Sequence, residues 1–450
     1  MSKLKSILMT MLMFFLTMLN ATASTLDATI QKTYLNKTST IAVSVKDTKT
    51  NKVVYEYNQN KLLNPASVQK IFTLRSAYKE LGKDYKFTTS AYKDNENNLY
   101  IKLGADPSLT TEKLINLFQN IKEQTPETTF KDLIIDPTII DDKQWGIGWM
   151  WDDDTSSLLP KYSPYSINEN KIAIKITPNK NGTMPQITNQ SNYPMQIINI
   201  VKHGKYNNLN FERMPWNTAD TTTISGTIAK EETVLLPVNF PEKYFTIELN
   251  NALKKVKLET TGSLKIAPVN KNAHLLSEIK SQPIEEILGT TLKNSNNFNT
   301  EMIFKVAGGH YTKKQGSTES AVDMFEKEYS SLSDDGHIIV DGCGISRNNL
   351  LTADWITSAL NKIYAEEDFP IFEKLLAKPI EGTLANRLLN ISLKVRAKTG
   401  TASGISSIAG YIDTKSGKKY SFAIIIQNHN INPNEIKDFE DKLINEIYKM

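Results

Sequence analysis

The pattern of hydrophobic and polar positions predicts two strands and then a helix near the start of the chain. Residues 40–45 and 52–57 are rich in β-branched and aromatic side chains, and the polar run between them predicts a turn. A helix is predicted next, because Asn64 suits its N-cap, Pro65 its first position and Gly82 the residue that ends it. Its apolar side chains recur at spacings of three and four, so one face is buried.

Residues 85–237 follow a different pattern, with short alternating segments separated by stretches rich in Asn, Thr and Lys. This pattern predicts one or two mostly β insertions rather than continuous α/β structure. Helical periodicity returns at residues 284–292 and 299–307.

The last part of the chain predicts a hairpin-containing sheet and a closing amphipathic helix. The strands are predicted at residues 393–397, 407–412 and 420–427, and a turn joins the last two. One face of the helix is apolar and includes Leu443 and Ile447. Packing of this face on the adjacent sheet is favoured over binding to a membrane surface, because the acidic residues of the helix would be repelled by anionic lipid.

The first residues have the composition of a secretory signal peptide. Lys3 and Lys5 precede an apolar run over residues 7–19, and the small residues Ala21-Thr22-Ala23 follow it. The run is too short for a permanent membrane span, so cleavage after about Ala23 is favoured over an uncleaved anchor. The chain is therefore predicted to be exported. Periplasmic residence is preferred, and the exterior of a Gram-positive cell stays open.

Length, charge and composition narrow the function classes. A net charge of +4 over 450 residues gives no basic footprint for nucleic acid. The length predicts two or three domains, and 40% hydrophobic residues are enough to fill their cores. Cys343 is the only cysteine, so it forms no internal disulfide. A small buried hydrophobe is favoured for Cys343 over a reactive thiol.

Ser67-Val-Gln-Lys70 is selected as a catalytic element from six copies of Ser-x-x-Lys in the chain. It follows a predicted strand pair and falls in the first turn of the predicted helix, which puts Lys70 on the same side one turn later. A lysine destabilised by burial or by a neighbouring cation can take the serine proton. Unpaired N–H groups in a first helical turn can bind an oxyanion.

Two later triplets stand in the order that a serine acyl-transfer site of the penicillin-recognising type requires. In Ser295-Asn296-Asn297, Ser295 could relay a proton to the leaving group and Asn297 could hold the substrate backbone. In Lys398-Thr399-Gly400, which occurs once, Lys398 offers a cation for a carboxylate, Thr399 a hydroxyl, and Gly400 room for a substrate beside the strand. Taken singly, Ser295 is better interpreted as a surface-loop residue than as a catalytic one. For Lys398 taken singly, a solubilising lysine on an edge strand is as good an interpretation as a substrate-binding one.

Other catalytic schemes lack their residues in this sequence. There is no Gly-x-Ser-x-Gly motif, and the five histidines are scattered. No Cys/His cluster, metalloprotease helix, Walker loop or dinucleotide glycine motif is present. No cofactor and no metal are therefore predicted.

With these elements, the chain resembles the D-alanyl-D-alanine carboxypeptidase/endopeptidases of the low-molecular-mass class C penicillin-binding proteins, the peptidase S13 family. The resemblance covers nearly the whole chain after the signal peptide. The segments that carry it are Leu63–Lys70, Gly104–Leu109, Gly148–Asp153, Tyr165–Asn170, Asp341–Leu350, Glu381–Leu384 and Arg396–Gly400.

The resemblance implies an α+β multidomain fold. A β-lactamase/transpeptidase-like domain, with an antiparallel sheet flanked by helices, would carry mostly β domains inserted between the Ser-x-x-Lys and Ser-x-Asn elements. The predicted division is a signal peptide at 1–23, a discontinuous catalytic domain at 24–85 and 270–450, domain II at 86–172 and 237–269, and domain III at 173–236.

The resemblance also implies roles for residues. Ser67 would form the acyl-enzyme with Lys70 as base, Ser295 would assist proton transfer, and Asn297 would hold the substrate amide. Lys398 would bind the terminal carboxylate with Thr399 and Gly400. Asp153 and Arg347 would read a diaminopimelic side chain. The chain departs from the family at Asn296, where Asp is common, and at Cys343, where Ser is usual.

The expected function is a serine-type D-Ala-D-Ala carboxypeptidase, and also a D,D-endopeptidase, that acts on peptidoglycan peptides and is acylated by β-lactams. The alternatives are a serine β-lactamase and a catalytically weak peptidoglycan-binding scaffold. The oligomeric state and protein partners are not predicted, and no transmembrane anchor is expected after signal cleavage.

Overall fold

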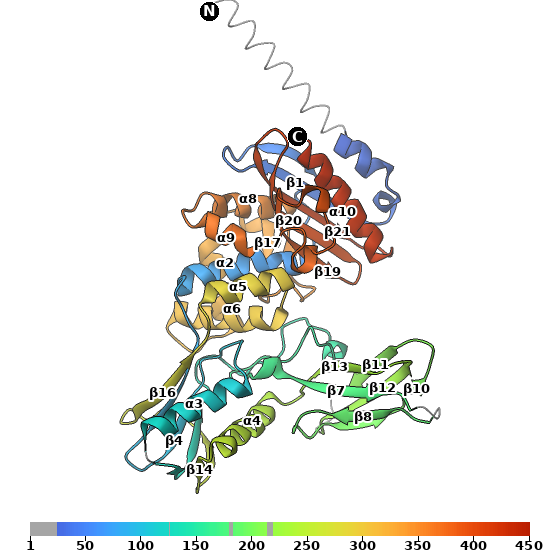
Figure 1. Ribbon diagram of the computed structural model, residues 1–450. Helices are drawn as coiled ribbons and strands as arrows, with labels where there is room; N and C mark the ends of the chain where they lie inside the picture. The colour runs from blue at the N-terminus through green and yellow to red at the C-terminus, as the bar shows by residue number, and fades with distance from the viewer. Residues whose placement is uncertain (1–24, 126, 180–182, 214–218) are drawn as a thin grey trace, which may run out of the picture. The chain divides into compact units, whose positions relative to one another are not determined.

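The structure is a computed structural model that describes residues 25–125, 127–179, 183–213 and 219–450 (Figure 1). The predicted signal peptide at residues 1–23 lies outside the described residues. The chain forms two compact units. The first comprises Met1–Ser76, Glu285–Ser295 and Val322–Met450, and the second comprises Ala77–Ile284 and Asn296–Ala321. The predicted boundaries of three domains stay a prediction.

A five-stranded antiparallel sheet is the centre of the first unit. Its strands run in the order β19 (Val395–Ala402), β20 (Ile405–Asp413), β21 (Lys419–Gln427), β1 (Thr40–Asp47) and β2 (Val53–Tyr57). The first and last parts of the chain therefore meet in one sheet through β1 and β21. All five strands were predicted, and β19 extends past the predicted end to include Lys398, Thr399 and Gly400.

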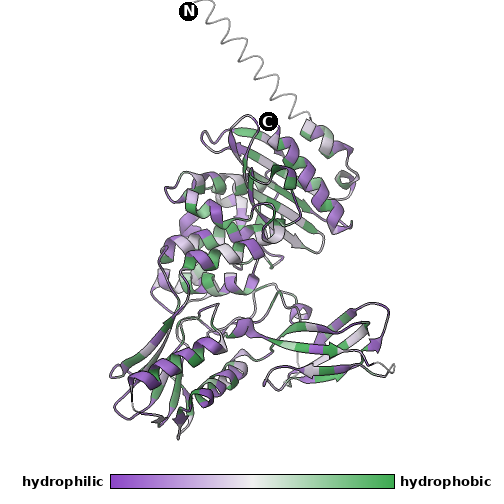
Figure 2. Ribbon diagram, in the orientation of Figure 1, coloured by the Kyte–Doolittle hydropathy of each residue, from purple (hydrophilic) through white to green (hydrophobic). Residues whose placement is uncertain are grey.

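Helices cover the two faces of this sheet. Helix α10 (Pro433–Tyr448) buries Ile436, Leu443, Ile444 and Ile447 in a core with the strand residues Val43 and Val45. Helix α8 (Ala353–Tyr364) lies on the other face, where the hydroxyls of Ser44 and Thr357 are 2.8 Å apart. Figure 2 shows mainly hydrophobic strands and hydrophilic residues along α10. The predicted packing of the last helix on the sheet is thus confirmed.

The remaining helices of the first unit surround the start of α2 (Lys70–Leu81). The Phe72 ring packs edge-on against Trp355 of α8, with ring centroids 5.1 Å apart. The buried guanidinium of Arg75 contacts both carboxylate oxygens of Asp368, at 2.7 and 2.6 Å. These contacts fix the helix that follows Ser67. The other elements are α5 (Ile284–Asn294), α7 (Thr318–Tyr329), α9 (Phe369–Leu375), β17 (His337–Ile338), β18 (Leu350–Leu351) and the short 3₁₀ turns η1 (Tyr34–Lys37), η5 (Asp334–Gly336), η6 (Gly382–Leu384) and η7 (Leu389–Ile391).

The second unit contains several smaller sheets and three helices that flank or connect them. One sheet has the order β15 (Leu264–Ile266), β6 (Leu133–Asp136), β4 (Leu99–Lys102), β3 (Thr88–Lys93) and β16 (His274–Lys280). A second runs β13 (Glu232–Pro237), β7 (Lys171–Thr177) and β8 (Gln186–Asn189). A third runs β10 (Lys202–His203), β12 (Thr221–Ile228) and β11 (Asn208–Arg213), with β9 (Gln196–Asn199) also paired to β12. A two-stranded pair joins β14 (Glu259–Thr260) and β5 (Thr129–Phe130). Helix α6 (Asn297–Thr312) belongs to this unit as well.

Two helices in this unit were not predicted from the alternating pattern. They are α3 (Thr111–Gln124) and α4 (Pro241–Val256), and both contribute to the hydrophobic core of the unit. Among the described residues, no helix has both the length and the apolar composition needed to cross a membrane.

Candidate active site

Ser67 lies in a 3₁₀ turn, η2 (Ala66–Gln69), that leads directly into α2. The prediction of a regular helix from Pro65 was wrong, because Ala66 has a φ of 45° and regular helix starts only at Lys70. The Asn64 side chain still caps the turn, since its Oδ1 accepts the Ala66 N–H at 3.0 Å. The Val68 N–H donates to the Pro65 carbonyl at 3.2 Å. The Ser67 N–H therefore lies between two N–H groups that are already bonded.

Lys70 contacts the Ser67 hydroxyl, as the spacing of the two residues predicted. Its side chain is fully buried, and its Nζ lies 2.8 Å from Ser67 Oγ. The same Nζ donates to the carbonyl oxygen of Cys343 at 2.6 Å. The contact with Ser67 places the amine where it can exchange a proton with the serine hydroxyl.

The loop that supplies the Cys343 carbonyl is held by the buried side chain of Asp341. Its Oδ1 accepts the Gly344 N–H at 2.8 Å, and its Oδ2 accepts the Ser346 N–H at 2.7 Å. Gln69 Nε2 donates to the Asp341 carbonyl at 2.5 Å, which ties the loop to the turn that carries Ser67. Gly344 has a φ of 81°, and a Cβ there would lie 2.0 Å from the Ala66 carbonyl oxygen.

Ser295 and Lys398 form a second pair of hydroxyl and amine. Ser295 lies between α5 and α6 with a φ of 59°. Lys398 Nζ donates to Ser295 Oγ at 2.9 Å and to the Thr399 carbonyl at 2.7 Å. Burial, and next the nearby charge of Lys70, hold the pKa of Lys398 well below its usual value. Lys70 and Lys398 both belong to the first unit, and both side chains are fully buried.

The strand β19 lies against the turn that carries Ser67. The Ser407 hydroxyl on β20 donates to the Pro65 carbonyl at 2.6 Å. A Cβ at Gly400 would lie 2.2 Å from Ser407 Oγ, 2.7 Å from the Pro65 oxygen and 3.0 Å from the Ser67 nitrogen. Because Gly400 has no side chain, β19 can approach Ser67 closely. The space beside Gly400 is therefore filled by the protein itself rather than left for a substrate.

Asn297 is the first residue of α6 and belongs to the second unit. Its side chain is buried, and Nδ2 donates to the Leu158 carbonyl at 3.0 Å. Asn296 is the N-cap of the same helix, and its Oδ1 accepts the Asn299 N–H at 2.9 Å. Capping is a role that Asn and Asp perform equally well, so the departure at Asn296 leaves the helix start intact.

Asp153 and Arg347 lie in different units. Asp153 ends the 3₁₀ turn η3 (Trp151–Asp153) in the second unit, and it is partly buried. Arg347 is exposed in the loop of the first unit between β17 and β18. Their joint recognition of a side chain stays a prediction.

Several residues that shape this site were not singled out as site residues from the sequence. The Cys343 carbonyl contacts Lys70, whereas the sequence drew attention only to its thiol, which is buried. Thr383 Oγ1 accepts the Thr399 hydroxyl at 2.7 Å. Asp341 and Thr383 both lie in segments that carried the family resemblance, so the signal for them was present.

Comparison with known proteins places this site in a family. Residues 22–447 match the family model described as the D-Ala-D-Ala carboxypeptidase 3 (S13) family. The chain is 24% identical over 440 residues to the D-alanyl-D-alanine carboxypeptidase DacB of Haemophilus influenzae, covering 91% of each chain. It is 26% identical over 420 residues to the D-alanyl-D-alanine carboxypeptidase of an Actinomadura species, covering 86% of this chain and 77% of that one.

The fold matches solved structures of the Haemophilus influenzae protein. Its penicillin binding protein 4 (dacB) structure has a TM-score of 0.84 at 24% identity and covers 94% of this chain and 99% of that chain. A second structure of that protein, complexed with a β-lactam, has a TM-score of 0.79 at 22% identity over the same shares of both chains. The predicted α+β fold is therefore confirmed. The chain belongs to the D-Ala-D-Ala carboxypeptidase 3 (S13) family and is a serine hydrolase.

Proposed function

We propose that this protein removes terminal D-alanine from peptidoglycan stem peptides through an acyl-enzyme on Ser67. The single observation that supports this best is the contact of 2.8 Å between the Ser67 hydroxyl and the buried Nζ of Lys70. A serine hydroxyl needs an adjacent base before it attacks a carbonyl, and Lys70 is the group in hydrogen-bonding range.

In the acylation step, Ser67 Oγ attacks the carbonyl carbon of the penultimate D-alanine, and its proton moves to Lys70 Nζ. The Ser67 N–H would donate to the oxyanion that forms. As the peptide C–N bond breaks, the proton that Lys70 took from Ser67 would pass through Ser295 to the leaving amine, and Lys398 contacts Ser295 at 2.9 Å. Water then hydrolyses the ester on Ser67 and releases the shortened peptide.

Lys398 is proposed to bind the terminal carboxylate of the substrate. Burial disfavours its ammonium form, and an arriving carboxylate favours that form again, so the two charges would stabilise each other. Thr399 would donate its hydroxyl to the same carboxylate after leaving Thr383. Gly400 would keep the strand close enough to Ser67 for one substrate to reach both.

Asn297 is proposed to hold the substrate amide, and Asp153 and Arg347 to read the amine and carboxylate of a diaminopimelic side chain. An acid and a guanidinium match these two groups in charge. With these contacts the protein would also cut D-alanyl–diaminopimelate crossbridges. We also propose that the protein is exported to the periplasm, with cleavage after about Ala23, and that β-lactams acylate it. The β-lactam complex of the Haemophilus protein supports the last point.

The test combines mature protein, a labelled penicillin and purified muropeptides. We expect an adduct on Ser67 by peptide mass spectrometry, loss of labelling in Ser67→Ala, and release of D-alanine from pentapeptide muropeptides. Rapid turnover of the adduct without D-alanine release would favour a β-lactamase. Absence of both the adduct and D-alanine release would favour a binding scaffold. Each of these two results, the β-lactamase result and the scaffold result, overturns the proposal.

A further inference from the structure

A cavity of about 750 Å³ lies in the second unit, and of its lining residues only Asp153 has a role in the proposed function. It lies between the third sheet, β9, β11 and β12, and the segment from Trp151 to Ser156. Its volume falls within the range of roughly 300–1,000 Å³ that is typical of small-ligand sites. All its lining residues belong to the second compact unit.

One wall is the outer face of the sheet. Strand pairing sets Ile198 opposite Thr223 and Thr223 opposite Glu212, so the three side chains form a row across the sheet. Thr221 and Asn210 are two residues away along their strands and share this face. The wall thus presents one exposed apolar side chain, at 50% exposure for Ile198, among hydroxyls, an amide and a carboxylate.

The other wall carries an exposed aromatic ring beside two acids. Trp151 is 62% exposed, which is unusual for a side chain of its size, and Asp152 and Asp153 follow it. Thr155 donates its hydroxyl to the Phe211 carbonyl at 3.1 Å and so holds this wall against β11.

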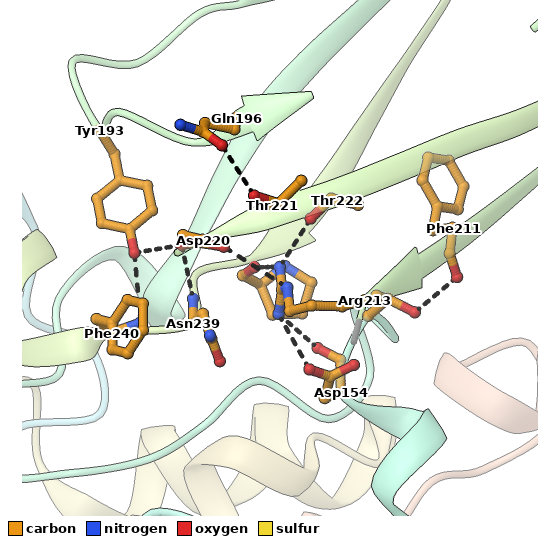
Figure 3. Close-up of polar contacts among 12 residues, drawn as sticks. Asp154, Tyr193, Gln196, Phe211, Arg213, Asp220, Thr221, Thr222, Asn239 and Phe240 are labelled. Atoms are coloured by element: carbon orange, nitrogen blue, oxygen red, sulfur yellow. Dashed lines mark hydrogen bonds and ion pairs between the residues drawn. The ribbon is translucent and has the colours of Figure 1, made fainter. Parts of the chain in front are cut away.

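Buried charges keep the two walls in place (Figure 3). Arg213, at the end of β11, donates through Nη1 to the Asp154 carbonyl at 3.2 Å and to Asp154 Oδ2 at 3.4 Å. Its Nη2 donates to the Pro237 carbonyl at 2.8 Å, and its Nε lies 3.6 Å from Asp220 Oδ1. Arg213 is itself 5% exposed and lines the cavity. A cavity held in this way is formed before a ligand arrives, which lowers the ordering cost of binding.

We propose that this cavity binds the glycan strand of peptidoglycan, a β-linked chain of N-acetylated amino sugars. The C–H face of a pyranose ring packs on an exposed indole, and the hydroxyls and acetamido groups of the sugar pair with carboxylates, amides and threonine hydroxyls. The carboxylates of Asp152, Asp153 and Glu212 disfavour anionic polymers such as nucleic acid. The choice of a cell-wall glycan rests on the proposed function, because the same polymer carries the peptide substrate.

The test measures binding of peptide-free glycan to protein whose Ser67 is already acylated by penicillin. The probe is a β-1,4-linked N-acetylglucosamine tetramer, which carries no charge, titrated by calorimetry. We expect saturable binding by the acylated wild-type chain. Trp151→Ala should weaken it at least about tenfold, as expected for loss of an aromatic anchor. Thr223→Arg, which fills the cavity from the opposite wall, should have the same effect.

Tyr206→Ala is the matched control, because Tyr206 is a 79% exposed aromatic residue of the same unit that does not line the cavity. It should bind glycan like the wild type, and all three variants should keep the wild-type rate of penicillin acylation. Absence of saturable binding by the wild-type chain overturns the glycan proposal, as does unchanged binding by both Trp151→Ala and Thr223→Arg. Neither result affects the proposed function, which is tested by the adduct on Ser67 and by D-alanine release.

Discussion

Lys70 donates a hydrogen bond of 2.6 Å to the backbone carbonyl of Cys343, a residue far away in the sequence. The Cys343 carbonyl and the Ser67 hydroxyl both bond to Nζ, so this contact with residue 343 is made by its backbone. The position of the loop, rather than the type of side chain at residue 343, is what this contact requires.

Cys343→Ser should therefore leave acylation nearly unchanged. We expect the second-order rate constant for labelled penicillin to stay within about threefold of wild type, because the carbonyl is kept. The buried hydroxyl can cost up to about 1–3 kcal/mol of stability where it lacks a partner. Stopped-flow acylation and thermal unfolding measure the two effects separately.

Gly344→Ala is the contrasting change in the same loop. Its Cβ would meet the Ala66 carbonyl oxygen at 2.0 Å, and its φ of 81° is strained for alanine. We expect a fall in acylation of roughly a hundredfold, because the loop and the Ser67 turn must separate. A larger effect of Cys343→Ser than of Gly344→Ala would contradict this account.

Gly400→Ala should impair acylation by displacing the strand from Ser67. The new Cβ would lie 2.7 Å from the Pro65 oxygen and 3.0 Å from the Ser67 nitrogen, and both are backbone atoms that cannot rotate away. A shift of about 1 Å in a reacting group costs on the order of a hundredfold in rate. The measurement is the rate of Ser67 labelling in folded, purified protein.

Gly289→Ala is the matched control for this prediction. Gly289 lies inside α5, and its Cβ would meet only Leu375 Cδ2, at an ordinary 3.6 Å. Alanine there should stabilise the protein by about 0.5–1 kcal/mol through helix propensity and leave labelling unchanged. Equal labelling rates in the two alanine variants would refute the proposed role of Gly400 in strand approach.

Local patterns were sufficient to predict the strands of the central sheet, the last helix and the pairing of Ser67 with Lys70. Each depends on a periodicity or a spacing of three residues, which the sequence displays directly. The positive φ at Ala66 was not predictable in this way, because tertiary contacts of Asn64 and of the loop at Gly344 impose it.

Helix α3 was missed although its signal was present. Thr110 caps it, and Leu114, Leu117, Phe118 and Ile121 recur at helical spacing, but the surrounding alternation favoured strands. The contacts of Lys70 with Cys343 and of Lys398 with Ser295 join distant segments. A single sequence carries no information on such pairs beyond the family resemblance. The catalytic roles and the three-domain boundaries stay predictions.

Lys398→Met should lower kcat/KM for peptides with a free terminal carboxylate. Loss of one partner of a buried charge pair costs roughly 2–5 kcal/mol, and this loss should appear in D-alanine release. A substrate whose terminal carboxylate is amidated should lose far less, because it never makes the pair. Equal losses with both substrates would argue against carboxylate binding by Lys398.

The same variant should also change how stability depends on pH. The pKa of Lys398 is lowered in the folded state by burial and by Lys70, so between that pKa and its usual 10.5 the unfolded chain binds more protons. Stability contributed by this residue therefore rises with pH through that window. Lys398→Met should be more stable than wild type at pH values below the lowered pKa, and the difference should shrink as the pH approaches 10.5. Urea unfolding across the pH series measures it, and a difference that grows with pH would contradict the prediction.

Arg213→Met should destabilise the second unit strongly, because it leaves Asp154 and Asp220 buried without their shared cation. Breaking one partner of a buried ion pair costs about 3–5 kcal/mol. The burial of Asp154 already raises its pKa, and Arg213 is the first group that opposes this rise, so the variant should raise the pKa further. Asp154 should then bind a proton in the folded state, and the deficit in stability should be smaller at acidic pH than at neutral pH.

Lys175→Met is the control for Arg213→Met in the same unit. Lys175 forms an ion pair of 2.9 Å with Glu231, and the two side chains are 37% and 51% exposed. An exposed pair contributes about 0–1 kcal/mol, so this variant should unfold close to the wild-type temperature. Calorimetry measures the loss of stability in both variants. Similar losses of stability in the two would mean that the charges around Arg213 are not buried. A large loss in Arg213→Met alone would establish this network as the support that holds the Trp151–Ser156 segment against β11.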